Sequence, residues 1–322
     1  MIERFEGCVA VITGAASGFG LEAARMAARH GMRVVLADIE AAALERAAAE
    51  VAALGAEVLP HALDVSKGCQ VEALAAATLE RFGTPHLLFN NAGVGLGGLV
   101  WEHSAADWEW AIGVNLMGVA HGVRVFVPLM LAAAAADPAW RGHVVNTASM
   151  AGLVNMPNMG AYNVSKHAVV SLSETLLQDL RLVTSQIGAS VLCPYFVPTG
   201  IGQSARNRPP EVAGSRSGTD TGTGMSTSQR IAREMIAKAV QSGKVSASDV
   251  VQRVFDAVRE DRFYIFSHPH ALSGVQSRLE DILQQRNPSD PFAARPEIGR
   301  TLREALRGDS SRESAGPESG AS

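Results

Sequence analysis

Short apolar runs alternate along the chain with longer alanine-rich segments, in which apolar residues recur about every three to four positions. The short runs are rich in Val, Ile and Leu, which is typical of strands buried on both faces. Strands are predicted at Cys8–Thr13, Arg33–Asp38, Glu57–Leu63, His86–Asn90, His143–Thr147, Ala189–Cys193 and Arg262–Phe266. Helices are predicted at Phe19–His30, Glu40–Leu54, Gln70–Phe82, Asp107–Ala134 and Tyr162–Thr184.

This repeat of strand and helix predicts an α/β fold, a doubly wound parallel sheet with helices on both faces, in one domain over residues 1–308. Pro128 is expected to kink the fourth helix or to end its regular part. Residues 200–229 lack an apolar period and predict a long loop that is a substrate lid, a surface insertion or a partner-binding segment. Helix is predicted over Ile231–Val258 and again from residue 273 to 286. Residues 309–322 are polar and predict a disordered tail.

Composition and charge exclude several classes of protein. Of the 322 residues, 47% are apolar, and the net charge is −4. This balance supplies a core and offers no basic surface for nucleic acid or an anionic membrane. The N-terminus lacks a signal-peptide pattern, and the longest apolar stretch, 125–136, is too short to span a bilayer. Cys8, Cys69 and Cys193 have no metal-ligand spacing and are interpreted as buried, reduced thiols, so we expect a soluble cytoplasmic protein without a metal site.

A glycine-rich loop, TGAASGFG, follows the first predicted strand and precedes a helix. Gly14, Gly18 and Gly20 allow a tight turn and a close approach of the backbone to a pyrophosphate, and the helix presents free N–H groups and the positive end of its dipole. A plain tight turn would use the same glycines. The residues around the loop therefore decide between the two interpretations.

Asp38 ends the second predicted strand, 18 residues after Gly20. A carboxylate here can accept hydrogen bonds from the adenosine ribose hydroxyls and would repel the 2′-phosphate of NADP. No compensating base is present, because Ser17 precedes Gly18 and Ile39 follows Asp38. These residues predict that the cofactor is NAD rather than NADP.

Tyr162 and Lys166 lie one helical turn apart and share a face. A free tyrosine has a pKa of about 10 and is a poor base near neutral pH. A lysine ammonium beside it, together with the positive nicotinamide of NAD⁺, is expected to lower the pKa of Tyr162. Tyr162 is therefore the candidate acid/base for the proton that moves when a hydride is transferred to or from a carbinol carbon.

Five motifs in order resemble the short-chain dehydrogenase/reductase family over residues 5–199. They are TGAASGFG, NNAG at 90–93, Asn115, Ser149 and the pair Tyr162 and Lys166, with the family's usual 13 residues from Ser149 to Tyr162. The resemblance implies a single-domain Rossmann sheet of seven strands that uses NAD or NADP. It also implies a homodimer or homotetramer.

The resemblance assigns roles to three further catalytic residues beside Tyr162. Ser149 would donate to the substrate oxygen, although a serine after a strand can also be a simple cap. Lys166 would bind the nicotinamide ribose as well as support Tyr162. Asn115 would join a proton relay through a water, or else hydrogen-bond to a neighbouring helix turn.

The cofactor contacts follow from the same resemblance and from the loop. Asp64 and the Val65 amide would contact adenine, although Asp64 or Ser66 could instead cap the next helix. The Asn90–Gly93 turn would line the adenosine ribose, and the Val197 backbone would meet the carboxamide. The predicted cofactor-binding residues are Gly14, Ser17, Gly18, Phe19, Gly20, Asp38, Ile39, Asp64, Val65, Asn91, Ala92, Gly93, Tyr162, Lys166, Pro194, Val197 and Thr199.

The chain departs from the family after the sixth strand, where Tyr195 replaces the glycine that usually follows proline. Its side chain is expected either in the substrate cleft or against a neighbouring helix. The extended C-terminal part resembles a subgroup that includes dehydrogenases of bulky aryl alcohols. We expect an oxidoreductase that interconverts a small-molecule secondary alcohol and a ketone. The alternatives are an NAD(H)-binding regulator without turnover, or an epimerase or an imine or enoyl reductase.

Overall fold

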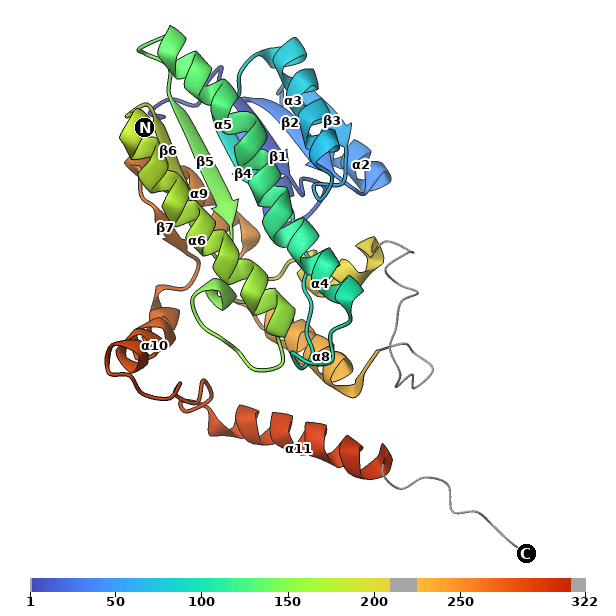
Figure 1. Cartoon of the computed structure of the whole chain (residues 1–322). Helices are drawn as coiled ribbons and strands as arrows, with labels where there is room; N and C mark the ends of the chain where they lie inside the picture. Colours follow the sequence, from blue (N-terminus) through green and yellow to red (C-terminus); the bar gives the residue numbers. More distant parts are fainter. Residues whose placement is uncertain (1, 209–224, 314–322) are drawn as a thin grey trace, which may run out of the picture.

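The computed structural model describes residues 2–208 and 225–313 and has the predicted seven-stranded parallel sheet (Figure 1). The strand order β3-β2-β1-β4-β5-β6-β7 reverses direction between β1 and β4. In such sheets, ligands bind in the crevice outside the carboxyl ends of the strands at this switch point. The strands are β1 (Val9–Thr13), β2 (Arg33–Asp38), β3 (Val58–Ala62), β4 (Leu87–Asn90), β5 (Gly142–Thr147), β6 (Ile187–Cys193) and β7 (Tyr264–Phe266).

Helices cover both faces of the sheet, with α5 and α6 crossing the face turned to the viewer in Figure 1. Side chains of β1 alternate between the two cores: Ala10 and Ile12 pack with α1, α2 and α9, whereas Val9 and Val11 pack with α3, α5 and α6. The α-helices are α1 (Gly18–Arg29), α2 (Ala41–Ala52), α3 (Gly68–Phe82), α4 (Ala105–Ile112), α5 (Gly118–Ala136), α6 (Gly160–Val183), α8 (Thr227–Gln241), α9 (Ala247–Glu260), α10 (Ser273–Leu283) and α11 (Pro296–Glu313). Shorter helical segments are η1 (Gly113–Met117), η2 (Met150–Gly152), η3 (Gly200–Asn207) and η4 (Pro269–Leu272).

The fourth predicted helix differs from the expectation. Pro128 lies inside α5, which continues to Ala136, so the prediction that Pro128 ends its regular part was wrong. The regular hydrogen bonding is interrupted earlier, in η1, where the Gly118 N–H donates to the Gly113 carbonyl five residues back, as in a π-helix. The helical run from Ala105 to Ala136 is long and apolar enough, by length and composition alone, to cross a membrane. Here it packs between α3, α6 and the sheet.

The C-terminal third contains more helix than expected. The predicted helix Ile231–Val258 is two helices, α8 and α9. The predicted loop 200–229 begins with η3 and ends where α8 starts at Thr227, and residues 209–224 lie outside the described part. Helix α11 was not predicted, because it is polar and its packing depends on a few residues such as Leu302, which is buried. It extends to Glu313, so the disordered tail expected at 309–322 was wrong for residues 309–313, and residues 314–322 lie outside the described part.

The cysteines only partly match their interpretation. All three are free thiols, but only Cys193 is buried. Cys8 is half-buried, and Cys69, at the start of α3, is exposed. The apolar runs around Cys8 and Cys193 indicated burial, whereas Cys69 stands in a polar helix start, so the prediction that Cys69 is buried was wrong.

Candidate active site

The backbone of the glycine loop folds back on itself, so that Gly14 and Gly20 lie close together. Gly14 and Gly18 have φ angles of +66° and +54°, which side chains other than glycine rarely adopt. A Cβ added to Gly20 would stand 2.0 Å from the Gly14 carbonyl oxygen and 2.8 Å from Asn91 Nδ2. The loop can therefore keep this shape only with glycines, and it leaves the N-terminus of α1 without an acidic residue in its first turn, open to a phosphate.

Asp38 fixes the other side of the loop. Its Oδ2 accepts the Ala16 N–H at 2.9 Å, and its Oδ1 accepts the Glu40 N–H at 3.0 Å. These bonds hold the carboxylate at the end of β2, where an adenosine ribose would reach it.

Most of the predicted cofactor residues line one cavity of about 160 Å³ at the switch point. Gly20 does not line it and packs behind the loop, and Val197 lines the neighbouring cavity instead. Neither Asp64 nor Ser66 caps α3, whose N-cap is Lys67; Asp64 Oδ1 accepts the Ser66 N–H at 2.9 Å. Residues that line the cavity and were not predicted include Glu40, Leu63, Val94, Trp110, Thr147, Ser204, Arg206 and Asn207.

The buried pair Tyr162 and Lys166 lies at the carboxyl end of β5. Lys166 Nζ is 5.9 Å from the centroid of the Tyr162 ring and donates to the Thr147 carbonyl at 2.9 Å. Ser149 hydrogen-bonds the Tyr162 side chain. Ser149 Oγ also accepts the Ala151 N–H at 3.1 Å, so this serine both caps η2 and faces Tyr162.

The protonation of this pair differs from the expectation. Burial raises the pKa of Tyr162, and the hydrogen bond from Ser149 lowers it only in part. The protein alone therefore does not lower the pKa of Tyr162, and the lowering expected from Lys166 together with bound NAD⁺ stays a prediction. Burial also lowers the pKa of Lys166 to about 8. The Tyr162 phenol is consequently protonated at neutral pH.

Asn115 lies in η1 and is fully buried. Its Oδ1 accepts the Val94 N–H at 2.8 Å, and its Nδ2 donates to the Val94 carbonyl and to Ser165 Oγ, both at 3.0 Å. Ser165 Oγ in turn donates to the Tyr162 carbonyl at 2.8 Å. The side chain thus ties the loop after β4 to α6, the helix of Tyr162 and Lys166, as the alternative of a hydrogen bond to a neighbouring helix turn predicted. The proton relay through a water stays a prediction.

A second cavity of about 310 Å³ adjoins the first and is bordered by Ser149 and Tyr162. Apolar side chains dominate its wall, among them Met150, Met156, Met159, Phe196, Val197, Ile236 and Val240. Tyr195 also lines it, with its ring centroid 4.6 Å from that of Phe196 and 5.8 Å from that of His268. The residue in place of glycine therefore borders the candidate substrate cavity and contacts the segment before η4 rather than a helix.

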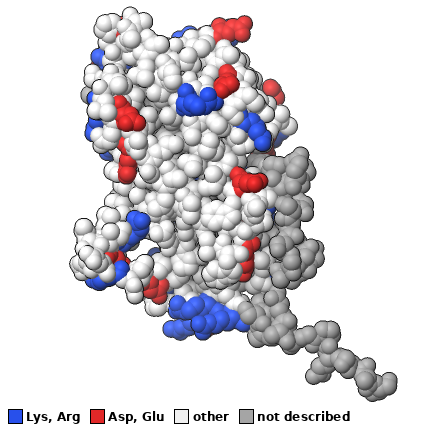
Figure 2. Space-filling model, viewed as in Figure 1, with Lys and Arg blue, Asp and Glu red and all other residues white. Residues whose placement is uncertain are grey.

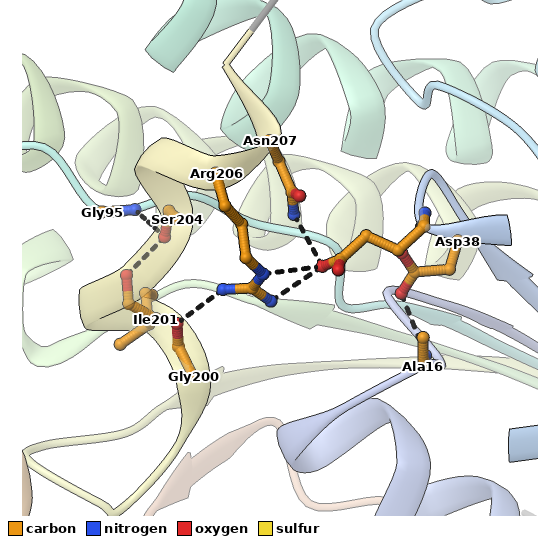
Figure 3. Close-up of polar contacts among 9 residues, drawn as sticks. Ala16, Asp38, Gly95, Gly200, Ile201, Ser204, Arg206 and Asn207 are labelled. Atoms are coloured by element: carbon orange, nitrogen blue, oxygen red, sulfur yellow. Dashed lines mark hydrogen bonds and ion pairs between the residues drawn. The ribbon is translucent and has the colours of Figure 1, made fainter. Parts of the chain in front are cut away.

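Segment η3 runs across the cofactor cavity (Figure 3). In the middle of η3, Ser204 Oγ accepts the Gly95 N–H at 3.0 Å and donates to the Ile201 carbonyl. At its C-terminal end, Arg206 Nη2 and Nε lie 2.8 and 2.9 Å from Glu40 Oε1, which also accepts from Asn207 Nδ2 at 3.1 Å. These bonds connect the chain after β6 with the chain after β2, so η3 is a strap over the groove.

Comparisons with known proteins agree with this geometry. A family model described as short chain dehydrogenase matches residues 8–210. The chain is 32% identical to the CLA biosynthesis dehydrogenase/reductase of Lactiplantibacillus plantarum, over 89% of this chain and 97% of that protein. It is 31% identical to C alpha-dehydrogenase of Sphingobium sp. strain SYK-6, over 92% and 93% of the two chains. A short-chain dehydrogenase/reductase of Burkholderia phymatum, crystallised in complex with NAD, superimposes with a TM-score of 0.85 and 53% identity, covering 91% of this chain and all of that one.

A seven-stranded Rossmann sheet with a glycine loop and a Ser–Tyr–Lys group at its switch point defines a nicotinamide-dependent oxidoreductase. The chain belongs to the short-chain dehydrogenase/reductase family. Family members bind a nicotinamide cofactor, and solved structures similar to this chain contain NAD or NADP.

The strap predicts a measurable effect on cofactor release. Replacement of Arg206 by glutamine removes the ion pair with Glu40, which is partly exposed and therefore contributes about 0.2–1 kcal/mol. We expect NADH to dissociate up to about fivefold faster, measured by stopped-flow fluorescence. Arg124→Gln is the matched control. Arg124 Nη2 lies 2.8 Å from Glu72 Oε1, and this ion pair is outside the site. Equal release rates for the two variants would show that the strap does not retain the cofactor.

Proposed function

We propose that this protein is an NAD-dependent oxidoreductase that interconverts a secondary alcohol and a ketone. The observation that carries the proposal is the position of Tyr162, whose side chain borders both the cofactor cavity and the apolar cavity beside it. A proton donor at this junction is within reach of a substrate oxygen next to a nicotinamide. Lys166 and Ser149 flank it on the two sides.

Tyr162, Ser149 and Lys166 each have a separate role in the proposed reaction. A bound nicotinamide supplies or accepts the hydride. During ketone reduction Tyr162 donates its phenolic proton to the substrate oxygen, and Ser149 donates a hydrogen bond to the same oxygen as negative charge develops. The Lys166 ammonium stabilises the phenolate that remains. Alcohol oxidation uses the same groups in the reverse direction.

The choice of NAD depends on Asp38. Its carboxylate stands where a 2′-phosphate of NADP would be repelled, and the similar Burkholderia phymatum structure contains NAD. Replacement of Asp38 by serine removes this repulsion together with the bond to the ribose. We expect the ratio of kcat/KM for NAD⁺ over NADP⁺ to fall at least about tenfold, which corresponds to about 1.4 kcal/mol. An unchanged ratio in initial-rate assays would show that Asp38 does not select the cofactor.

The pH dependence of ketone reduction follows from the two buried groups. Reduction needs a protonated Tyr162, whose pKa is raised by burial, and a charged Lys166, whose pKa is lowered by burial to about 8. Both protons are lost as the pH rises. We therefore expect kcat/KM for reduction by NADH to be highest below pH 8 and to fall through about pH 8. A reduction rate that increases steadily above pH 8 would contradict this assignment.

The apolar side chains that line the second cavity favour a bulky, apolar substrate. Aryl carbinols belong to this class. Its volume of about 310 Å³ is at the lower end for pockets that enclose a drug-sized molecule. A screen of secondary alcohols and ketones, followed by the absorbance of reduced nicotinamide, tests the activity with NAD and NADP in parallel. NADH binding without turnover of any compound would favour a regulatory role, and product analysis would reveal an epimerase or an imine or enoyl reductase.

We also propose that the protein self-associates through the face formed by α5 and α6. Figure 2 shows few charged side chains over the middle of this face. Exposed apolar residues in this region are Met117, Val164, Leu182 and Val183. Apolar surface of this kind marks interaction sites in proteins.

A further inference from the structure

One face of α8 forms a wall of the apolar cavity. Gln229, Arg233, Ile236 and Val240 all line the cavity, and their spacing of four, three and four residues places them on the same side of the helix. From Gln229 to Val240 the helix rises about 16 Å. The wall is therefore long, polar toward the start of the helix and apolar toward its end.

The cavity has an unbalanced positive charge. Among the described residues that line it, the charged ones are Arg208 and Arg233, and none is acidic. Arg208 Nη2 lies 2.5 Å from Asp107 Oδ1, and its guanidinium is 5.5 Å from the centroid of the Trp110 ring. The Arg233 guanidinium instead has a contact of 4.0 Å to the sulfur of Met225. In the described parts of the chain, no carboxylate pairs with Arg233.

The side of a helix that faces an apolar cavity usually carries apolar residues. A charged residue there departs from this pattern, and such departures concentrate at functional positions. Arg233 lines the cavity and is also exposed to solvent, so a substrate can reach its guanidinium. The fork of N–H donors of an arginine matches the two oxygens of a carboxylate. We propose that Arg233 recognises a carboxylate on the substrate. The substrate is then an elongated apolar alcohol or ketone with a carboxylate remote from the reacting carbon, an assignment that rests on the proposed function.

The test separates binding from turnover. A mid-chain hydroxy fatty acid and its methyl ester differ in the charge of the carboxyl group and in one methyl group. Their binding is followed by tryptophan fluorescence, because Trp110 lines the cavity. Wild-type protein is expected to bind the acid at least about tenfold more tightly than the ester. Arg233→Gln should weaken binding of the acid about 10–100-fold and leave the ester unchanged, and Arg233→Lys should restore part of the difference.

Lys238→Gln is the matched control, because it removes a positive charge from the same helix at a position that does not line the cavity. It should bind both probes as the wild type does. Wild-type protein that binds both probes equally or neither, or an Arg233→Gln variant that weakens both alike, overturns the proposal. Oxidation of the probes by NAD⁺ is measured separately. A preference for the acid without any turnover would support Arg233 as a carboxylate site and contradict the proposed dehydrogenase activity.

Discussion

Replacement of Tyr162 by phenylalanine is expected to lower kcat by about 10²–10⁴-fold, the usual contribution of a positioned acid or base. The variant loses only the phenolic hydroxyl and its hydrogen bond to Ser149, because the buried ring is retained. In the proposed complex the glycine loop and the groups around Asp38 would hold the cofactor, so the Kd for NADH should remain largely unchanged. Initial rates and NADH fluorescence measure the two effects separately.

Tyr264→Phe provides the matched control for this variant. Tyr264 also donates through its hydroxyl, to Glu174 Oε1 at 2.6 Å, but it lies on β7 outside both cavities. This substitution should leave kcat intact. If Tyr162→Phe kept full activity, or if both variants lost activity alike, Tyr162 would not be the acid/base.

The second large effect is expected at Gly20, where alanine should weaken NADH binding by about 10–100-fold. An alanine Cβ would stand 2.0 Å from the Gly14 carbonyl oxygen, which is a backbone atom and cannot rotate away. The loop must shift to relieve this overlap, at a cost of about 1–3 kcal/mol, and that shift moves the N–H groups that would face the pyrophosphate. Titration of NADH fluorescence measures the loss.

Gly274→Ala is the control for Gly20→Ala. Gly274 lies in α10, and its added Cβ would make an ordinary contact of 3.6 Å with Val154. NADH affinity and the melting temperature of this variant should match the wild type. Circular dichroism of Gly20→Ala distinguishes a local change in the loop from loss of the fold. A folded Gly20→Ala protein with normal NADH affinity would contradict the role of the loop.

The parts of the site that the sequence predicts are those built from short segments. The glycine loop, Asp38 and the pair Tyr162 and Lys166 each follow from local spacing, because a strand end or a single helical turn fixes their positions. The contact of Arg206 with Glu40 joins residues 166 positions apart, and neither residue stands in a motif. The residues of α8 that line the cavity likewise could not be recognised from the sequence, because their role depends on the packing of α8 beside the cavity of Tyr162.

The pKa of Tyr162 likewise depends on local neighbours, which the sequence shows, and on tertiary burial, which it does not. The neighbours of Tyr162 on its own helix are visible in the sequence, and they predicted a lowered pKa. The burial that dominates comes from the surrounding elements and raises it. Helix α11 was missed for a related reason: its apolar residues are sparse, and its contact with α8 is a tertiary interaction. Strand and helix positions elsewhere were predicted to within a few residues, because the apolar periods are continuous there.

The central step of the proposed function is the passage of a hydride between a carbinol carbon and nicotinamide at Tyr162. The direct measurement uses an apolar secondary alcohol that carries deuterium on its carbinol carbon, incubated with NAD⁺ and the wild-type protein. Mass spectrometry is expected to find one deuterium in the reduced nicotinamide and none after incubation with Tyr162→Phe. Reduced cofactor without deuterium, or a ketone product formed without reduction of NAD⁺, would contradict the account.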